Sequence, residues 1–308
     1  MAMKRQTPGR QAAWLPLLIV ILFAPAAASS AEFPMRGELA GALRTYVTTD
    51  EDTLLDVARR EELGYVELRA ANPDIDPWLP GAGTVVQLPT AGLLPDAPRR
   101  GIVINLPEQR LYFFRDDPAT VVTYPIGIPT WETPIPLGRT KVVAKRPNPT
   151  WFPPSSLRAE HPELPESVPP GPDNPLGAFA ISLAWPSFVI HGTNKPDGIG
   201  RRVSHGCIRL YPENIEALYA MVPVGTPVTI VDQPVKAGWS DGTLYLEVHP
   251  TQDEAEQVEA DGRVTEPAPL DAESVIRTKA GERINAVDWA LVRRVVRERR
   301  GVAVPITR

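Results

Sequence analysis

The sequence predicts a mainly β protein in three parts: a small β-α-α-β module, a larger antiparallel β domain, and a C-terminal extension with a helix. Three observations support this fold class. Short β-prone runs separated by turn residues recur between positions 100 and 232, which is typical of an antiparallel sandwich or barrel. Apolar residues at helical spacing stand out within 45–90 and near the C-terminus. The 36 prolines gather in connecting stretches, so they indicate stiff loops rather than a repeat.

Residues 1–31 have the pattern of an export signal peptide. Lys4, Arg5 and Arg10 precede the uncharged apolar run Trp14–Ala24, and small residues follow it. The run is shorter than the ~20 residues that span a bilayer, and no later segment is long enough to cross one. We therefore expect cleavage and no stable membrane span; an uncleaved anchor helix is the alternative. Cleavage would move the formal charge from −5 to −8, which disfavours nucleic-acid binding.

The module at 45–90 has short helices between two strands. Its expected elements are a strand at Thr45–Val47, a helix from Thr53 capped by Asp52, a helix over Val66–Ala71 and a returning strand over Thr84–Leu88. An ordinary docking subdomain would fit this order as well.

The module also resembles the lysin motif (LysM), a family that binds glycans containing N-acetylglucosamine. Glu51 departs from the glycine that often precedes the Asp-Thr-Leu triplet in this family. The matching residues are Tyr46-Val47, Asp52-Thr53-Leu54, Val57-Ala58, Asn72-Pro73, Pro80-Gly81 and Leu88-Pro89. The resemblance implies a peptidoglycan-binding module.

The larger domain, at 100–232, follows a proline-containing linker. Its predicted strands are Ile102–Leu106, Arg110–Phe114, Thr120–Pro125, Lys141–Lys145, Phe179–Leu183, Ser187–Ile190 and Pro227–Val231. Residues 146–175 hold ten prolines and cannot be regular structure throughout. Trp151 and the stiff prolines favour an ordered lid over a site; a mobile spacer is the alternative.

The C-terminal extension, residues 233–308, begins with another predicted strand, Thr243–Val248. The acidic stretch 253–273 is expected to be loosely ordered. Asn285 is the expected cap of a terminal helix. Arginines gather near the end of that helix, where they favour the helix dipole; a docking patch for an acidic partner is the alternative.

Cys207 is the only cysteine of the chain and lies sixteen positions after His191. A lone cysteine with histidine elsewhere is a candidate nucleophile, provided that a base or cation lowers its pKa from about 8.5. His191 ends an apolar strand that can hold it rigidly. Gly192 and Gly206 let the backbone approach a substrate closely, and Arg209 could pair with a carboxylate.

Other interpretations of these residues stay open. Cys207 could be a small core residue, and His205 is expected to orient its neighbours rather than to transfer a proton. A zinc site built from His191, His205, Cys207 and Asp197 is a further alternative. It is disfavoured because no C-x-x-C or H-x-x-x-H spacing accompanies these residues.

The pattern around the cysteine is similar to that of the L,D-transpeptidase catalytic domain (YkuD type). His191-Gly192 is followed after eleven residues by Ser204-His205-Gly206-Cys207, as in that family. The resemblance covers roughly 100–232. Features similar to the ErfK/YbiS/YcfS/YnhG group are Ile208-Arg209-Leu210, Asn148-Pro149-Thr150-Trp151, Gly171–Gly177 and His191-Gly192-Thr193-Asn194.

The resemblance implies a β-sandwich and acyl transfer on peptidoglycan without a metal or organic cofactor. Cys207 would attack the third residue of a tetrapeptide stem and expel D-alanine. His191 would be the acid/base, oriented by a carbonyl near Gly192, and the N–H groups of Gly206 and Cys207 would hold the oxyanion. His205 belongs to the same expected catalytic group. The expected substrate-binding residues are Arg209, Ser204, Trp151 and Asn194.

The family resemblance also implies partners and a place in the cell. The expected location is the periplasm, and the expected partners are peptidoglycan stems and glycan. The acceptor amine would belong to another stem, giving a 3→3 cross-link, or to a lysine of an outer-membrane lipoprotein. The alternatives are an L,D-carboxypeptidase or hydrolase that uses water, and an idle wall-binding protein. Deleting 45–90 is expected to weaken wall binding more than turnover of soluble stems.

Overall fold

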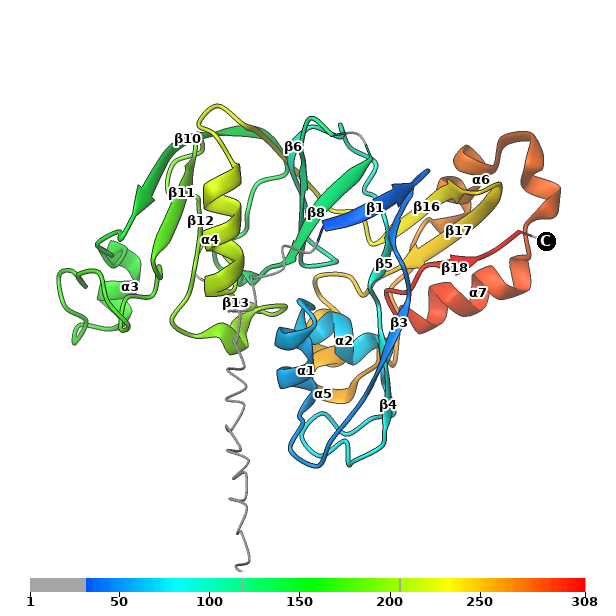
Figure 1. Ribbon diagram of the computed structural model, residues 1–308, viewed down its shortest axis with the longest axis horizontal. Helices are drawn as coiled ribbons and strands as arrows, with labels where there is room; N and C mark the ends of the chain where they lie inside the picture. Colours follow the sequence, from blue (N-terminus) through cyan, green and yellow to red (C-terminus); the bar gives the residue numbers. More distant parts are fainter. Residues whose placement is uncertain (1–31, 118, 205, 308) are drawn as a thin grey trace, which may run out of the picture.

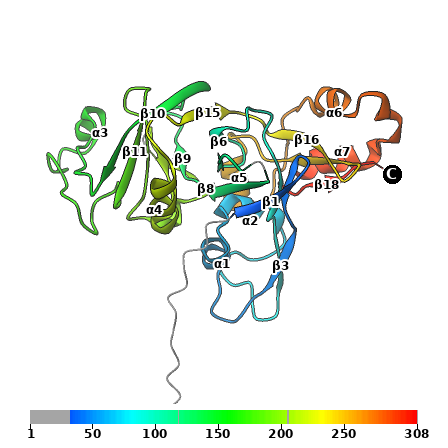
Figure 2. The same ribbon diagram turned by 45° about the horizontal axis from the view of Figure 1, so that its top comes forward.

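The computed structural model describes residues 32–117, 119–204 and 206–307, so the predicted signal peptide lies outside the described residues. Figure 1 and Figure 2 show three groups of elements. The β domain carries α3 (Ser155–Glu160) and α4 (Pro212–Met221) at one end, and the N-terminal module lies below the middle in Figure 1. Most of the C-terminal elements occupy the opposite end, whereas α5 (Ala255–Asp261) lies beside the N-terminal module. Within the described ranges, no helix is long and apolar enough to cross a bilayer.

The N-terminal module has the β-α-α-β order expected from its sequence. Its elements are β3 (Arg44–Val47), α1 (Leu54–Arg60), α2 (Tyr65–Ala71) and β4 (Val85–Leu88), with the two strands antiparallel. The prediction that Asp52 caps the first helix was wrong. The Thr53 hydroxyl accepts from the N–H of Asp56 at 3.1 Å, and the Asp56 carboxylate accepts from the N–H of Thr53. This reciprocal capping box satisfies two N–H groups that the helix leaves unpaired.

The β domain is built on an eleven-stranded sheet of order β14-β12-β11-β10-β15-β6-β7-β8-β1-β2-β5. The strands are β1 (Glu32–Arg36), β2 (Leu39–Gly41), β5 (Ala91–Leu93), β6 (Gly101–Asn105), β7 (Arg110–Phe114), β8 (Thr120–Pro125), β10 (Gly138–Pro147), β11 (Phe179–Leu183), β12 (Val189–His191), β14 (Ile208–Arg209) and β15 (Pro227–Val231). The mainly β class is confirmed.

The expected antiparallel arrangement does not hold for three strand pairs. β6 pairs with β15, and β12 with β14, in parallel. The two-residue β9 (Ile128–Pro129) also runs parallel to β13 (Arg202–Ser204). Parallel neighbours require long crossovers. Residues 106–226, which include the proline-rich stretch and α4, join β6 to β15, and residues 192–207 join β12 to β14.

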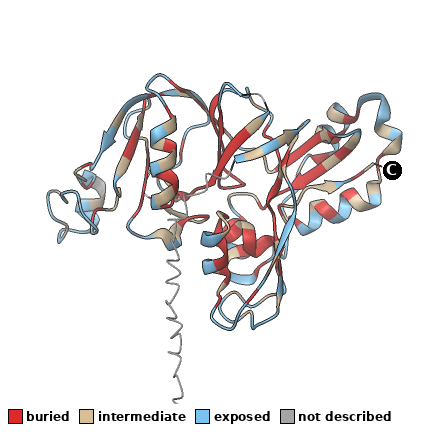
Figure 3. Ribbon diagram, in the orientation of Figure 1, coloured by how far each residue is buried: buried red, intermediate tan, exposed pale blue. Residues whose placement is uncertain are grey.

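One hydrophobic core runs along this sheet from β14 to β8. Ile104 and Leu111 of β6 and β7, Ile181 and Ile190 of β11 and β12, and Ile215 of α4 belong to it, and all are almost completely buried. Figure 3 shows buried residues along these strands and on the inner side of α4. Burying one such side chain is worth about 1.5–3 kcal/mol. The core therefore holds β12, which carries His191, in a fixed place.

The C-terminal extension contains more helix than its sequence predicts. Its elements are β16 (Val235–Ser240), β17 (Thr243–Val248), α5 (Ala255–Asp261), α6 (Ala272–Ala280), η2 (Gly281–Ala286), α7 (Trp289–Glu298) and β18 (Val304–Pro305). The expected cap Asn285 was wrong, because Asp288 accepts from the first N–H groups of α7. The expectation of loose order at 253–273 was wrong over α5. There, Ala255 and Val258 pack against the N-terminal module.

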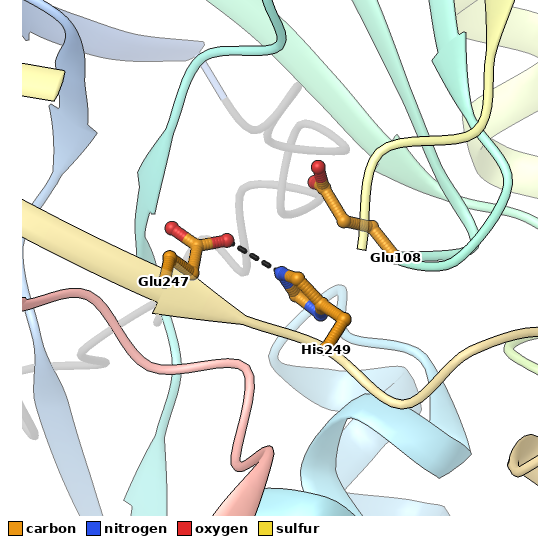
Figure 4. Close-up of side chains that lie close together, drawn as sticks. All are labelled: Glu108, Glu247 and His249. Carbon is orange, nitrogen blue, oxygen red and sulfur yellow. Dashed lines mark hydrogen bonds and ion pairs between the residues drawn. The ribbon is translucent and has the colours of Figure 1, made fainter. Parts of the chain in front are cut away.

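Charged side chains are buried together where the three parts meet. Lys236 Nζ lies 2.6 Å from Glu108 Oε1 and 2.7 Å from Glu247 Oε1. His249 Nε2 lies 2.6 Å from Glu247 Oε1 (Figure 4). Burial would raise the pKa of Glu247, but the ammonium of Lys236 and the hydrogen bond to His249 hold it well below its usual range. The cluster joins the β6–β7 turn to β16 and β17.

Candidate active site

Two neighbouring strands bring His191 and Cys207 to one wall. β12 ends at His191, and β14 begins directly after Cys207. In this parallel pair Ile190 lies opposite Ile208, and His191 lies opposite Arg209. Since side chains alternate between the faces of a strand, His191, Arg209 and Cys207 belong to one face. All three line a single cavity of about 930 Å³.

The proline-rich stretch forms the opposite side of this cavity. Trp151, Leu157 and Val168 line it together with the histidine and the cysteine. A backbone bridge joins Trp151 to Val168. The amide of Asn174, which is fully buried, donates to the carbonyls of Pro149, Val168 and Pro169. An irregular segment is thus fixed from within by one polar side chain.

His191 is 3% exposed, and a hydrogen bond of its imidazole ring determines the tautomer. Nδ1 lies 2.6 Å from the carbonyl oxygen of Gly192. Because a carbonyl can only accept, Nδ1 carries the proton and Nε2 keeps its lone pair when the ring is neutral. Burial lowers the pKa of His191 to about 4, and the charge of Arg209 acts in the same direction. The ring is therefore a neutral base at pH 7.

The thiol of Cys207 does not have the lowered pKa that its sequence setting suggests. Burial raises the pKa of Cys207, although a backbone hydrogen bond and the charge of Arg209 oppose the rise. Its Sγ lies 3.9 Å from the carbonyl oxygen of Ser187. The expectation of an ionised resting thiolate was wrong, because the effect of burial outweighs the charge of Arg209. The site at rest holds a neutral thiol and a neutral imidazole.

Arg209 presents a partly unused guanidinium to the cavity. It lies opposite His191 in the strand pair and lines the same space as Cys207. Within the described residues, its buried Nε has no hydrogen-bond partner. Burial lowers the pKa of Arg209, yet a guanidinium stays charged at any ordinary pH. The arrangement suits an anionic group placed beside the thiol.

Comparison with known proteins identifies relatives of this chain. The YkuD family, described as the L,D-transpeptidase catalytic domain, matches residues 99–230. The chain is 42% identical over 241 residues to the probable L,D-transpeptidase YcfS of Escherichia coli (strain K12), covering 75% of each chain. It is 37% identical over 315 residues to the probable L,D-transpeptidase ErfK/SrfK of Salmonella typhimurium (strain LT2), covering 99% of this chain and 98% of the relative. The chain belongs to the L,D-transpeptidase family. A solved structure, the catalytic domain of the E. faecium L,D-transpeptidase, is 22% identical with a TM-score of 0.36; the match covers 44% of this chain and 100% of that one.

The other residues expected in the transpeptidase site divide into two groups. Trp151 and Asn194 line the cavity, and Gly206 has a φ of +90° that suits glycine. Ser204, expected to bind substrate, is completely buried and donates to the carbonyl of Cys207. That expectation was wrong, because the hydroxyl shapes the turn before the nucleophile. His205 lies outside the described residues.

Sequence reasoning missed Arg201, which also lines the cavity of the transpeptidase. Its guanidinium lies 4.2 Å from the centre of the Tyr65 ring, and it forms a 3.3 Å ion pair with Glu259. Both partners are far away in the sequence. Its position in the sequence, six residues before Cys207, was the only local sign that Arg201 could belong to the site.

The zinc alternative receives no support from the described residues. Among them, the one group of His, Cys, Asp or Glu whose ligand atoms converge is Glu108, Glu247 and His249, which does not line the cavity. The ammonium of Lys236 already contacts both carboxylates there. A divalent cation at that position would repel it.

Proposed function

We propose that this L,D-transpeptidase forms a thioester between Cys207 and a peptidoglycan tetrapeptide stem and passes the acyl group to an amine. The observation that carries the proposal is the shared cavity in which β12 and β14 place His191, Cys207 and Arg209 on one face. Supporting it, relatives of this family act on peptidoglycan. The cavity is large enough for a peptide, since ligand sites commonly measure about 300–1,000 Å³.

The first half-reaction uses the neutral pair directly. Sγ of Cys207 attacks the carbonyl carbon of the third stem residue while Nε2 of His191 accepts the thiol proton. The N–H groups of Gly206 and Cys207 stabilise the oxyanion. As the tetrahedral intermediate collapses, the C–N bond to D-alanine breaks and its amine takes the proton from His191. Arg209 holds a stem carboxylate in place during this step.

The second half-reaction returns the enzyme to its starting state. A neutral amine attacks the thioester carbonyl and gives a proton to His191. The C–S bond then breaks, and the leaving thiolate of Cys207 takes that proton back from His191. The amine belongs to another stem or to a lysine of an outer-membrane lipoprotein. The wall formed by residues 146–175 limits the access of water, which favours transfer over hydrolysis.

The N-terminal module and the predicted signal sequence support a reaction at the cell wall. The β-α-α-β order at 45–90 supports a LysM-like module that binds glycan, and Trp78 is 57% exposed on its surface. An exposed aromatic ring offers an apolar face to a sugar. Cleavage of 1–31 would release the enzyme into the periplasm.

Incubation with purified muropeptides, with and without a lysine-ended peptide, followed by mass spectrometry tests the reaction. We expect release of D-alanine, and a new amide whenever an amine acceptor is present. Loss of D-alanine without a new amide would assign the enzyme as a carboxypeptidase. Release of the lipoprotein link would assign it as a hydrolase.

A carbapenem provides a separate test of the nucleophile, because its strained ring acylates such thiols. One adduct per chain is expected on Cys207, and none in Cys207→Ala. His191→Gln should acylate at least about a hundredfold more slowly, as removal of a general base costs about 10²–10⁴-fold. His161→Gln is the matched control, since His161 is exposed. Unchanged acylation of Cys207→Ala would refute the proposal.

A further inference from the structure

The chain segments on either side of Cys207 both dock on the N-terminal module. Residues 199–201 lead into β13 before the cysteine, and residues 211–214 begin α4 after it. The module meets these segments with residues 59–67, which form the end of α1, the connecting turn and the start of α2. Figure 1 shows α1 and α2 beside the β domain where β13 and α4 begin.

Before the cysteine, the contact is made by the backbone. The N–H groups of Tyr65 and Val66 donate to the carbonyls of Ile199 and Gly200, at 3.4 and 3.2 Å. The first N–H groups of a helix have no partner inside it. The catalytic domain therefore supplies acceptors to the amino end of α2.

Two glycines permit this close approach. Gly200 has a φ of +76°, and a Cβ placed there would collide with the N of Tyr65 and the Cα of Gly64. A Cβ on Gly64 would in turn lie 3.0 Å from the Cα of Gly200. Next to this contact, the guanidinium of Arg201 stacks 4.2 Å from the Tyr65 ring and lines the catalytic cavity.

A continuous series of backbone hydrogen bonds joins this contact to the catalytic strand. Gly200 N–H donates to the Ile126 carbonyl at 3.1 Å, and Ile128 N–H donates to the Arg201 carbonyl at 3.0 Å. Between them, Gly127 exchanges two bonds with Arg209, at 2.8 and 2.9 Å. Arg209 lies two residues after the nucleophile. A shift of α2 would therefore be transmitted to β14.

After the cysteine, side chains make the contact. The Tyr211 hydroxyl donates to the Leu63 carbonyl at 3.4 Å, and the Asn214 amide donates to the Glu62 carboxylate at 2.9 Å.

A buried ion pair anchors the same region of the module to the sheet. Arg110 of β7 lies 2.6 Å from the Glu67 carboxylate, and both side chains are at most 10% exposed. Glu67 also accepts from the N–H of Gly64. The ion pair thus fixes the glycine contact itself.

We propose that the N-terminal module helps to position the catalytic residues of the transpeptidase site. Gly64 and Glu67 of the module and Gly200 of the catalytic domain are the positioning residues. This inference rests on the proposed thioester chemistry at Cys207. It replaces the sequence-based expectation that residues 45–90 act as a separable binding unit. The module holds the two segments that set the place of the thiol relative to the imidazole, whatever glycan it also binds.

The test compares Gly200→Ala with Gly81→Ala in the full-length mature enzyme. Both glycines have a φ near +76°, but a Cβ at Gly81 meets nothing within 4 Å. Both variants therefore carry the same backbone penalty, and only Gly200→Ala disturbs the contact. At saturating carbapenem, we expect the acylation rate constant per titratable thiol to fall about tenfold or more in Gly200→Ala, because small misplacements cost up to about 10²-fold. The acylation rate constant of Gly81→Ala should match that of the wild-type enzyme.

A second pair of variants covers the case in which Gly200→Ala does not fold. Glu67→Gln keeps the shape of the anchor but removes its charge, whereas Glu61→Gln removes a charge paired with Arg44 inside the module. Slower acylation is expected for Glu67→Gln alone. A role in stability only would lower the melting temperature and leave the rate constant per folded enzyme unchanged.

These outcomes separate the two proposals. The positioning role is overturned if Gly200→Ala or Glu67→Gln folds and is acylated as fast as its control variant. Wild-type enzyme that forms no adduct on Cys207 overturns the thioester chemistry instead.

Discussion

The buried imidazole of His191 should make this transpeptidase sensitive to mild acid. Burial holds its pKa at about 4 in the folded chain, against about 6.5 in the unfolded chain. At pH 7 the ring is neutral in both states and adds no pH dependence. As the pH falls below about 6.5, the unfolded state gains a proton that the folded state refuses, so the free energy of unfolding drops. The loss from this group is about 2 kcal/mol at roughly pH 5 and about 3 kcal/mol below pH 4.

Urea unfolding of wild type and His191→Gln at about pH 7 and pH 5 measures this loss. Glutamine keeps a donor for the Gly192 carbonyl and does not titrate. The difference in unfolding free energy between the two pH values should be smaller in His191→Gln by about 2 kcal/mol. The exposed His161, changed to Gln, is the control and should leave the difference as in wild type. An identical pH dependence in wild type and His191→Gln would refute a depressed pKa at this position.

Three further results are expected. The rate of Cys207 acylation should lose activity in acid with a midpoint near pH 4, because His191 must be neutral; a midpoint near 6.5 would contradict the burial argument. Lys236→Met should lower the unfolding free energy in urea by about 3–5 kcal/mol, because Glu108 and Glu247 are left buried without their cation; a loss under about 1 kcal/mol would show that water reaches them. Arg209→Lys should raise KM for stems about tenfold with little change in kcat, because lysine cannot form a bidentate pair with a carboxylate; steady-state kinetics that show an unchanged KM would remove its binding role.

Local patterns in the sequence predicted the elements but not their partners. A short apolar run marked the strand that ends in His191, and it forms as β12. The parallel pairing of β12 with β14 was not predictable, because β14 has two residues and no periodicity of its own. Yet that pairing is what brings Cys207 and His191 to the lining of one cavity. The sequence-based expectation that the two residues act together came from family resemblance rather than from spacing.

The same limit applies to the electrostatics of the site. A glycine and a histidine beside Cys207 suggested an accessible thiolate, whereas the folded chain partly buries the cysteine, and this burial raises its pKa. The groups that contact the sulfur include Ser187 and Val189, which are distant in sequence. Likewise, the residues around Gly200 in the sequence do not predict its contact with Gly64. The collision of a Cβ at Gly200 with Gly64 arises only when the two segments pack together in the folded chain.

A neutral resting thiol is compatible with the proposed chemistry and would have an advantage in the periplasmic location proposed above. Oxidation and alkylation attack thiolates, so a raised pKa would protect the single cysteine in an oxidising compartment. Once it loses its proton, a thiol of higher pKa is the stronger nucleophile. In the proposed reaction the proton leaves only as sulfur meets the stem carbonyl. Nε2 of His191 carries the lone pair that would accept it, because Nδ1 donates to the Gly192 carbonyl. No ion pair then has to be maintained in an apolar cavity between turnovers, where its desolvation would be costly.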